Sequence, residues 1–88
     1  MEVRKHITFY GRVQGVGFRC AAKRAAQSLR LTGWVKNEPD GTVIMEIQGR
    51  ELLINEALKA IHRNSFIKAE WIETKIVPTE KEDGFRIR

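Results

Sequence analysis

The chain has 88 residues, 42% of them hydrophobic, with 16 Lys plus Arg against 11 Asp plus Glu. This length predicts one small domain, residues 1–88, with roughly 60–70% of the unfolded surface buried and no need for disulfide or metal staples. The single cysteine, Cys20, excludes an internal disulfide. No apolar run approaches the ~20 residues that span a bilayer, and the first residues lack the apolar segment of a secretory signal. We therefore expect a soluble, monomeric, cytoplasmic protein without a membrane partner.

The net charge of +5 is concentrated in the first half of the chain. Residues 1–44 carry eight basic and three acidic side chains, whereas residues 45–88 carry eight of each. An anion-binding site is therefore expected in the first half. The plainer interpretation is a basic face that only keeps the protein soluble.

The first half of the chain predicts a strand, a helix and a hairpin. Apolar residues alternate with polar ones from 3 to 13, with Arg4 and His6 on the polar side, which is typical of a half-buried strand. After a glycine-rich turn at 14–17, apolar residues recur every three or four positions from 18 to 29, as in a helix. Segments 31–37 and 42–48 predict strands, and the Glu-Pro-Asp-Gly turn between them favours a β-hairpin.

The second half predicts a helix over 50–64, a strand over 67–76 and a short edge strand over 85–88. The alternation of the long strand slips near Ile72, which indicates either a bulge or a bend. The order is thus β-α-β-β-α-β with an additional C-terminal strand. It predicts an α+β fold, a ferredoxin-like α/β sandwich with two helices on one face of a mainly antiparallel sheet.

This topology predicts where a site would lie. A β-α-β crossover makes the first two strands parallel, so Gln14, Asn37 and the amino end of the first helix should emerge at one edge of the sheet. Gly15 and Gly17 would leave backbone N–H groups there accessible to an anion. An ordinary strand-to-helix turn is the alternative interpretation.

The first helix is charged against its own dipole. Its opening turns carry Arg19, Lys23 and Arg24, with no acid and no capping side chain. Cations at a positive helix end are unfavourable by a few tenths to about 1 kcal/mol each, unless an anion occupies the site. The charge pattern therefore favours an anion-binding loop.

The sequence Gly-Arg-Val-Gln-Gly-Val-Gly-Phe-Arg at 11–19, followed by Gly-Trp-Val-Lys-Asn at 33–37 and Asp-Gly at 40–41, resembles the acylphosphatase family. The similarity extends more weakly through Gly49 and the terminal Phe-Arg-Ile-Arg at 85–88. One departure is Asn-Ser-Phe at 64–66, where bacterial relatives often have a Gly-Pro pair. The family has a ferredoxin-like architecture. The resemblance implies hydrolysis of acyl phosphates to a carboxylate and inorganic phosphate.

The resemblance also implies residue roles. Arg19 would grip the phosphate with its planar guanidinium, and Asn37 would orient the attacking water through its amide. The phosphate would also accept bonds from backbone N–H groups of the loop, which comprises Gln14, Gly15, Val16, Gly17 and Phe18. The motif contains no general base, so the substrate phosphate would take the water proton, and positioning and electrostatics would provide the rate. The expected partner is a small acyl phosphate, with inorganic phosphate as product and competitive inhibitor and with no metal or cofactor.

Other reactive side chains are expected to be structural. Cys20 should be a small buried residue that points away from the site. His6 and His62 lack the spacing of a metal pair and should be surface or hydrogen-bonded residues. The acidic run of Glu80, Glu82 and Asp83 lacks calcium-ligand spacing and predicts a solvated loop.

Two alternative functions fit parts of this pattern. An RNA-binding module shares the element order and suits the pI of about 9.8, but the strand at 42–48 has no aromatic platform, so no nucleic-acid partner is expected. A detached acylphosphatase-like domain, as at the start of hydrogenase maturation proteins, would act on carbamoyl phosphate. The absence of zinc-finger cysteines and further domains favours a standalone enzyme.

Overall fold

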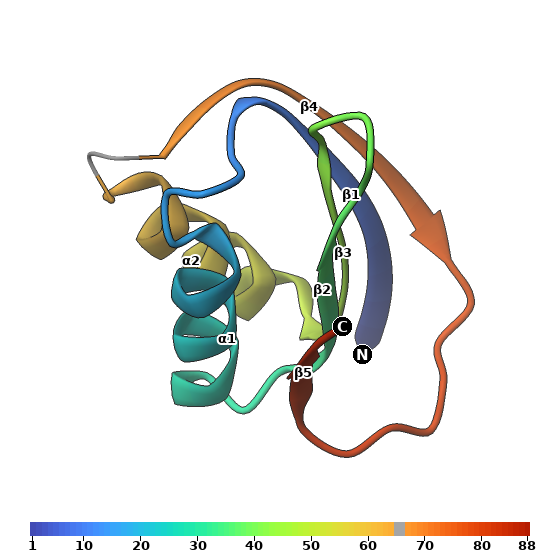
Figure 1. Ribbon diagram of the computed structural model, residues 1–88. Coiled ribbons are helices and arrows are strands. Elements are labelled where there is room, and N and C mark those ends of the chain that lie inside the picture. Colours follow the sequence, from blue (N-terminus) through green and yellow to red (C-terminus); the bar gives the residue numbers. More distant parts are fainter. Residues whose placement is uncertain (65–66) are drawn as a thin grey trace.

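A computed structural model describes residues 1–64 and 67–88 of the chain (Figure 1). The turn expected at 64–66 lies mostly outside the described residues. The elements follow the predicted order: β1 (Glu2–Arg12), α1 (Phe18–Ser28), β2 (Thr32–Asn37), β3 (Val43–Arg50), α2 (Glu51–His62), β4 (Lys68–Val77) and β5 (Phe85–Ile87).

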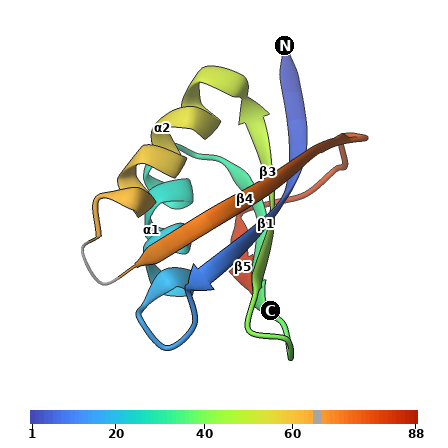
Figure 2. The same ribbon diagram turned by 90° about the horizontal axis from the view of Figure 1, so that it is seen from above.

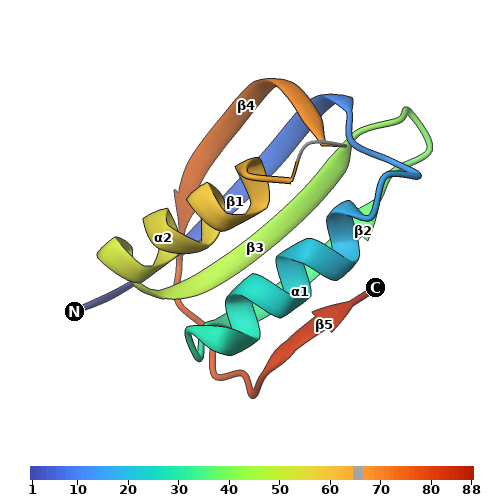
Figure 3. The ribbon, with the colours of Figure 1, turned by 90° about the vertical axis from the view of Figure 1, so that its left-hand side faces the viewer.

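The strands form one sheet in the order β4-β1-β3-β2-β5, in which only the β2–β5 pairing is parallel. Both helices cover the same face of this twisted sheet (Figures 2 and 3). The predicted ferredoxin-like α+β fold is confirmed, with β5 at a sheet edge as expected. The β2–β3 hairpin closes through the expected turn, where the Glu38 amide donates to the Thr42 carbonyl at 2.9 Å.

The core lies between the sheet and the helices. Ile7 and Phe9 of β1 are fully buried, and the Phe9 ring packs against that of Phe18 with centroids 4.6 Å apart. The buried face of α1 consists of Phe18 and four alanines, whose short side chains let the helix lie close to the sheet. Each fully buried large side chain contributes roughly 1.5–3 kcal/mol of hydrophobic stabilisation.

The bulge considered for the late strand is present. Tyr10 of β1 pairs with Trp71 of β4, whereas the next residue, Gly11, pairs with Ala69, so Glu70 has no residue opposite it. Gly11 has a φ of +110°, and a Cβ there would lie 2.4 Å from the Lys68 carbonyl oxygen. The close approach of β4 at the bulge therefore requires glycine at position 11.

The other face of the sheet corrects one sequence expectation. Arg4 was expected on a solvated polar side, yet it is 0% exposed. Its Nε donates to Glu46 at 2.7 Å and its Nη1 to Glu82 at 2.8 Å. The segment that joins β4 to β5 is held over this face, because Gln48 also exchanges hydrogen bonds with the Glu80 backbone.

The acidic run at 80–83 is therefore more than a solvated loop. Glu82 is largely buried against Arg4, although Glu80 stays 61% exposed and lies 3.5 Å from the same guanidinium. A buried guanidinium needs acceptors, and these carboxylates accept from its Nε and Nη1, whereas the buried Nη2 has no hydrogen-bond partner among the described residues. Burial opposes the charged form of Arg4, but the bonds to Glu46 and Glu82 outweigh it and raise the Arg4 pKa.

Candidate active site

The carboxyl ends of β1 and β2 lie at the same end of the sheet as the amino end of α1 (Figure 1). A small hollow of about 80 Å³ lies there, and its lining residues come from the loop after β1, the first turn of α1 and the end of β2: Val13, Gly15, Gly17, Phe18, Arg19, Cys20 and Asn37. A cavity needs about 10–15 Å³ to hold one water, so this hollow has room for a small oxyanion with a water beside it. The structure thus brings Arg19 and Asn37 together, whereas Val16 packs against the core.

The loop between β1 and α1 depends on left-handed backbone. Gly15 has a φ of +72° and Gly17 a φ of +83°. A Cβ at either position would meet nothing within 4 Å. The glycines are therefore needed for conformation, since a left-handed residue with a Cβ costs about 1–2 kcal/mol.

The first turn of α1 offers unpaired donors. Gly17 is the N-cap residue, no side chain of the described residues caps the helix, and no acid lies in the first turn. Because the first N–H groups of a helix have no partner within it, an anion at this end would accept hydrogen bonds and meet the positive end of the dipole. The uncapped start predicted from the sequence is thus present, and it faces the hollow.

Arg19 adds a permanent positive charge to this end. The side chain is exposed, and within the described ranges no carboxylate lies at ion-pair distance from it. Its five N–H donors are therefore available to a ligand. A guanidinium held by no acid beside a helix amino end is suited to bind phosphate.

Cys20 differs from expectation. It is exposed rather than buried, and it lines the hollow rather than pointing away from it. The reason is its position on the helix, since the buried face of α1 is formed by residues 18, 21, 22, 25 and 26. Residue 20 is turned off this face.

Asn37 ends β2 at the wall of the hollow. Its Oδ1 is buried and has no hydrogen-bond partner among the residues that the structure describes. A buried acceptor left unpaired costs about 1–3 kcal/mol. A water that donates to Oδ1 would remove this cost, so the atom is suited to hold a solvent molecule in the hollow.

The Gln14 side chain has a role that sequence reasoning missed. From the sequence alone, Gln14 was assigned only a backbone N–H of the phosphate loop. In the structure its side-chain Nε2 donates to the carbonyl oxygens of Glu38 and Thr42, at 2.7 and 2.9 Å. These two bonds join the loop after β1 to the hairpin after β2. The signal in the sequence was a side chain with two N–H donors placed at the strand end nearest the hairpin.

The hairpin itself is fixed by a second side chain. Asp40 Oδ1 accepts hydrogen bonds from the Thr42 hydroxyl at 2.6 Å and the Thr42 amide at 3.0 Å. These bonds lower the pKa of the Asp40 carboxyl. Asn37, the last residue of β2, is therefore followed directly by a turn that these hydrogen bonds hold.

The remaining titratable candidates have structural partners. His6 Nδ1 lies 2.7 Å from Glu46, and His62 Nδ1 lies 2.8 Å from the Leu58 carbonyl oxygen, as expected for hydrogen-bonded histidines. Over residues 1–64 and 67–88, no three His, Cys, Asp or Glu side chains are arranged to hold a metal ion. In the same ranges, no helix is long and apolar enough to cross a membrane.

Known proteins share both sequence and fold with this chain. The family model Acylphosphatase matches residues 5–87. The acylphosphatase of Clostridium acetobutylicum is 45% identical over 89 residues, which cover 99% of this chain and 98% of that protein. The crystal structure of the Bacillus subtilis acylphosphatase matches at a TM-score of 0.90 and 33% identity over 98% of both chains. The HypF protein of T. kodakarensis matches at a TM-score of 0.81 and 32% identity, over 99% of this chain but only 12% of that one. The chain therefore belongs to the acylphosphatase family of hydrolases.

Proposed function

We propose that this protein hydrolyses acyl phosphates at the hollow between β1, β2 and α1, without a metal or cofactor. One observation carries the proposal: the unpaired Asn37 acceptor, the uncapped start of α1 and the Arg19 side chain line the same 80 Å³ hollow. Membership of the acylphosphatase family supports the reaction class.

The phosphate end of the substrate binds first in this scheme. Backbone N–H groups of residues 14–18 and the Arg19 guanidinium bind its oxygens. The support is electrostatic. Arg19 is repelled by the positive end of α1, and a bound anion is attracted to both. The backbone donors belong to the loop and to the first turn of α1, so little reorganisation of them is needed as charge shifts in the transition state.

Asn37 orients the attacking water. The water oxygen attacks phosphorus, and the bond from phosphorus to the acyl oxygen breaks. The electron pair of that bond leaves with the carboxylate, and the water proton passes to a phosphate oxygen. A carboxylate is a good leaving group, so the reaction depends on positioning and charge stabilisation rather than on a protein acid or base.

Hydrolysis of benzoyl phosphate in metal-free buffer tests the residue roles. We expect kcat to fall about 100-fold or more in Arg19→Ala and in Asn37→Ala, the range measured when one transition-state donor is removed. Arg50→Ala and Asn55→Ala are matched controls, because both side chains are exposed on or beside α2. Activity that survives both site changes in folded protein would falsify the assignment.

Conservative changes sharpen the same test. Arg19→Lys keeps the charge but loses the planar fork, so it should bind phosphate more weakly. Asn37→Asp places a negative charge against the anion and should be worse than Asn37→Ala. Inorganic phosphate should inhibit the wild type competitively and inhibit Arg19→Ala less. A monomeric state and a cytoplasmic location remain predictions, the first of which sedimentation can check.

A further inference from the structure

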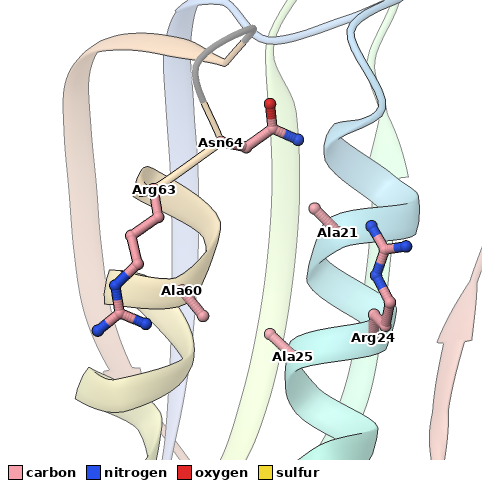
Figure 4. Close-up of a pocket in the computed structure, with 6 residues that line it drawn as sticks. All are labelled: Ala21, Arg24, Ala25, Ala60, Arg63 and Asn64. Carbon is pink, nitrogen blue, oxygen red and sulfur yellow. The ribbon is translucent and has the colours of Figure 1, made fainter.

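The outer face of the sheet, which points away from the helices, is covered over only part of its area. The segment that joins β4 to β5 lies over Arg4, near the start of β1. Near the end of β1 this face is open, as the 64% exposure of Trp71 on β4 shows. The helices and a groove of about 380 Å³ between them lie on the opposite face, and Figure 4 shows Arg24 and Arg63 there, with their guanidinium groups turned away from the groove.

Two aromatic rings lie side by side on the open part of the outer face. Tyr10 of β1 is the register partner of Trp71 of β4, and their ring centroids are 5.8 Å apart. Their chain neighbours Phe9 and Ile72 pack in the core, so the alternation of a strand places Tyr10 and Trp71 on the outer face. Most of the Trp71 ring is in contact with solvent, so it offers a flat apolar surface on which another ring can stack.

Two cations lie opposite each other beside these rings. Arg12 of β1 is the register partner of Lys68 of β4, and both side chains are exposed. Over residues 1–64 and 67–88, neither has an acid at ion-pair distance. Like charges directly opposite each other destabilise a strand pair. Arg12 follows Tyr10 by two residues, about 7 Å along the strand, so an anion that relieves this repulsion would lie beside the rings.

The acids near the rings are mostly engaged with neighbours. Glu73 accepts a hydrogen bond from the Tyr10 hydroxyl at 2.6 Å, and Asp40 accepts two from Thr42. Glu70, the bulged residue of β4, is exposed and adds one negative charge next to Trp71. The strand pair therefore presents two unpaired cations with one competing acid.

We propose that the patch formed by Tyr10, Trp71, Arg12 and Lys68 binds single-stranded nucleic acid. A base stacks on the exposed indole, and a neighbouring phosphate lies between the two cations. Exposed rings beside cations are the means by which proteins bind single strands without reading their sequence. No nucleic-acid partner was expected, because the strand at 42–48 lacks aromatic residues, but β1 and β4 supply the rings instead.

The patch uses features that RNA and DNA share, so it should bind both alike. Stacking needs the face of a base, and ion pairing needs a phosphate, and neither involves the 2′ position of the sugar. The bases of a duplex are already stacked on one another, so a duplex should bind more weakly than a single strand. This binding does not involve Arg19 or Asn37 and is independent of the proposed hydrolysis.

Fluorescence anisotropy of labelled dT and U oligomers of about 12 nucleotides tests the stacking. We expect the wild type to bind both with a Kd of about 1–100 µM at physiological salt. Trp71→Ala should raise Kd at least about fivefold, whereas Trp71→Phe, which keeps a ring, should raise it less than about twofold. Unlabelled oligomer should quench the tryptophan fluorescence of the wild type but not that of Trp71→Ala, because the remaining Trp34 is only 9% exposed.

The salt dependence of binding tests the two cations. In the double variant R12Q/K68Q, the slope of log K against log salt concentration should be less steep by about 1.4, since each phosphate contact on a single strand contributes about 0.7. The matched control R24Q/R63Q removes two charges from the helix face and should keep the wild-type slope. Glu70→Gln removes the competing acid and should lower Kd about twofold.

Arg19→Ala separates the patch from the phosphate-binding loop. Its Kd for the oligomers should stay within about twofold of the wild-type value, and loss of binding in this variant would place the strand at the hollow instead. The proposal is wrong if the wild type binds neither oligomer, or if folded Trp71→Ala binds as tightly as the wild type. It is equally wrong if R24Q/R63Q reduces the salt slope as much as R12Q/K68Q, because net charge alone would then explain the binding.

Discussion

The side-chain nitrogen of Gln14 lies 2.7 Å from the carbonyl oxygen of Glu38 and donates a hydrogen bond to it. The same amide reaches Thr42 at the other end of the hairpin turn. Glu38 directly follows Asn37, so this contact sets the distance between the glycine loop and the residue proposed to hold water. Gln14 is therefore a positioning residue in the proposed site.

Gln14→Met keeps the length of the side chain and removes both donors. We expect kcat for benzoyl phosphate to fall about 10- to 100-fold, because a displacement of about 1 Å at a reacting centre has effects of this size. The variant should also lose about 1–2 kcal/mol of unfolding free energy. The control is Gln27→Met, at an exposed residue of α1. If Gln14→Met has the same kcat as the wild type, the contact contributes to stability alone.

The left-handed loop allows a closely matched pair of variants. Gly15 and Gly84 both have a φ of +72° and free space around a would-be Cβ. Gly15→Ala and Gly84→Ala should therefore each cost about 1–2 kcal/mol in chemical denaturation. Only Gly15→Ala should also reduce kcat/KM, by about tenfold or more, since only that residue lies in the loop that lines the hollow. Equal activity in the two variants would argue against a role of this loop in binding phosphate.

Arg4→Met tests the buried charge on the other face of the sheet. The change leaves Glu46 and Glu82 largely buried without their cation, so we expect a loss of about 2–4 kcal/mol of unfolding free energy. Folded protein should keep its kcat, because Arg4 lies at the far end of β1 from the hollow. Arg86→Met, an exposed change on β5, should cost less than about 0.5 kcal/mol. If Arg4→Met loses as little unfolding free energy as Arg86→Met, the pairing of Arg4 with Glu46 and Glu82 contributes little net stability.

Glu46 should make the protein sensitive to acid. Burial opposes its charged form, but hydrogen bonds with His6 and Arg4 outweigh this and lower the Glu46 pKa below its ordinary value of 4.5. The unfolded state therefore binds a proton more readily, so the stabilisation is fully present above about pH 4.5 and is lost as pH falls through the folded-state pKa. Between pH 7 and pH 3, the free energy of unfolding measured by chemical denaturation should fall less in Glu46→Gln than in the wild type. The exposed variant Glu70→Gln should follow wild type, and identical slopes for all three proteins would contradict the prediction.

Much of the fold could be predicted because local patterns and global structure agree. The alternation along β1, the alanine-rich face of α1 and the turn at Asp40 each correspond to an element that the structure contains. The burial of Arg4 could not be predicted, because alternation assigns a residue to a face but does not say what covers that face. The cover comes from residues 78–84, more than 70 positions away in the sequence.

The candidate site was predictable in part. The glycines, Arg19 and Asn37 were found from the charge pattern, the topology and the resemblance, and they do line one hollow. The Gln14 side chain and the exposure of Cys20 were missed, because both depend on side-chain direction, which spacing along the chain does not determine.

The position of β1 in the sheet has a consequence for biosynthesis. Its neighbours are β3 and β4, so residue 2 pairs with residue 50 and residue 4 with residue 77. A ribosome that adds roughly 5–20 residues per second releases β1 seconds before its second partner exists. Both hydrogen-bonding edges of that strand stay unpaired until β3 emerges, and one of them stays unpaired until β4 is free of the exit tunnel. In the nascent chain β1 therefore gains its second neighbour only after residue 77 has left the ribosome.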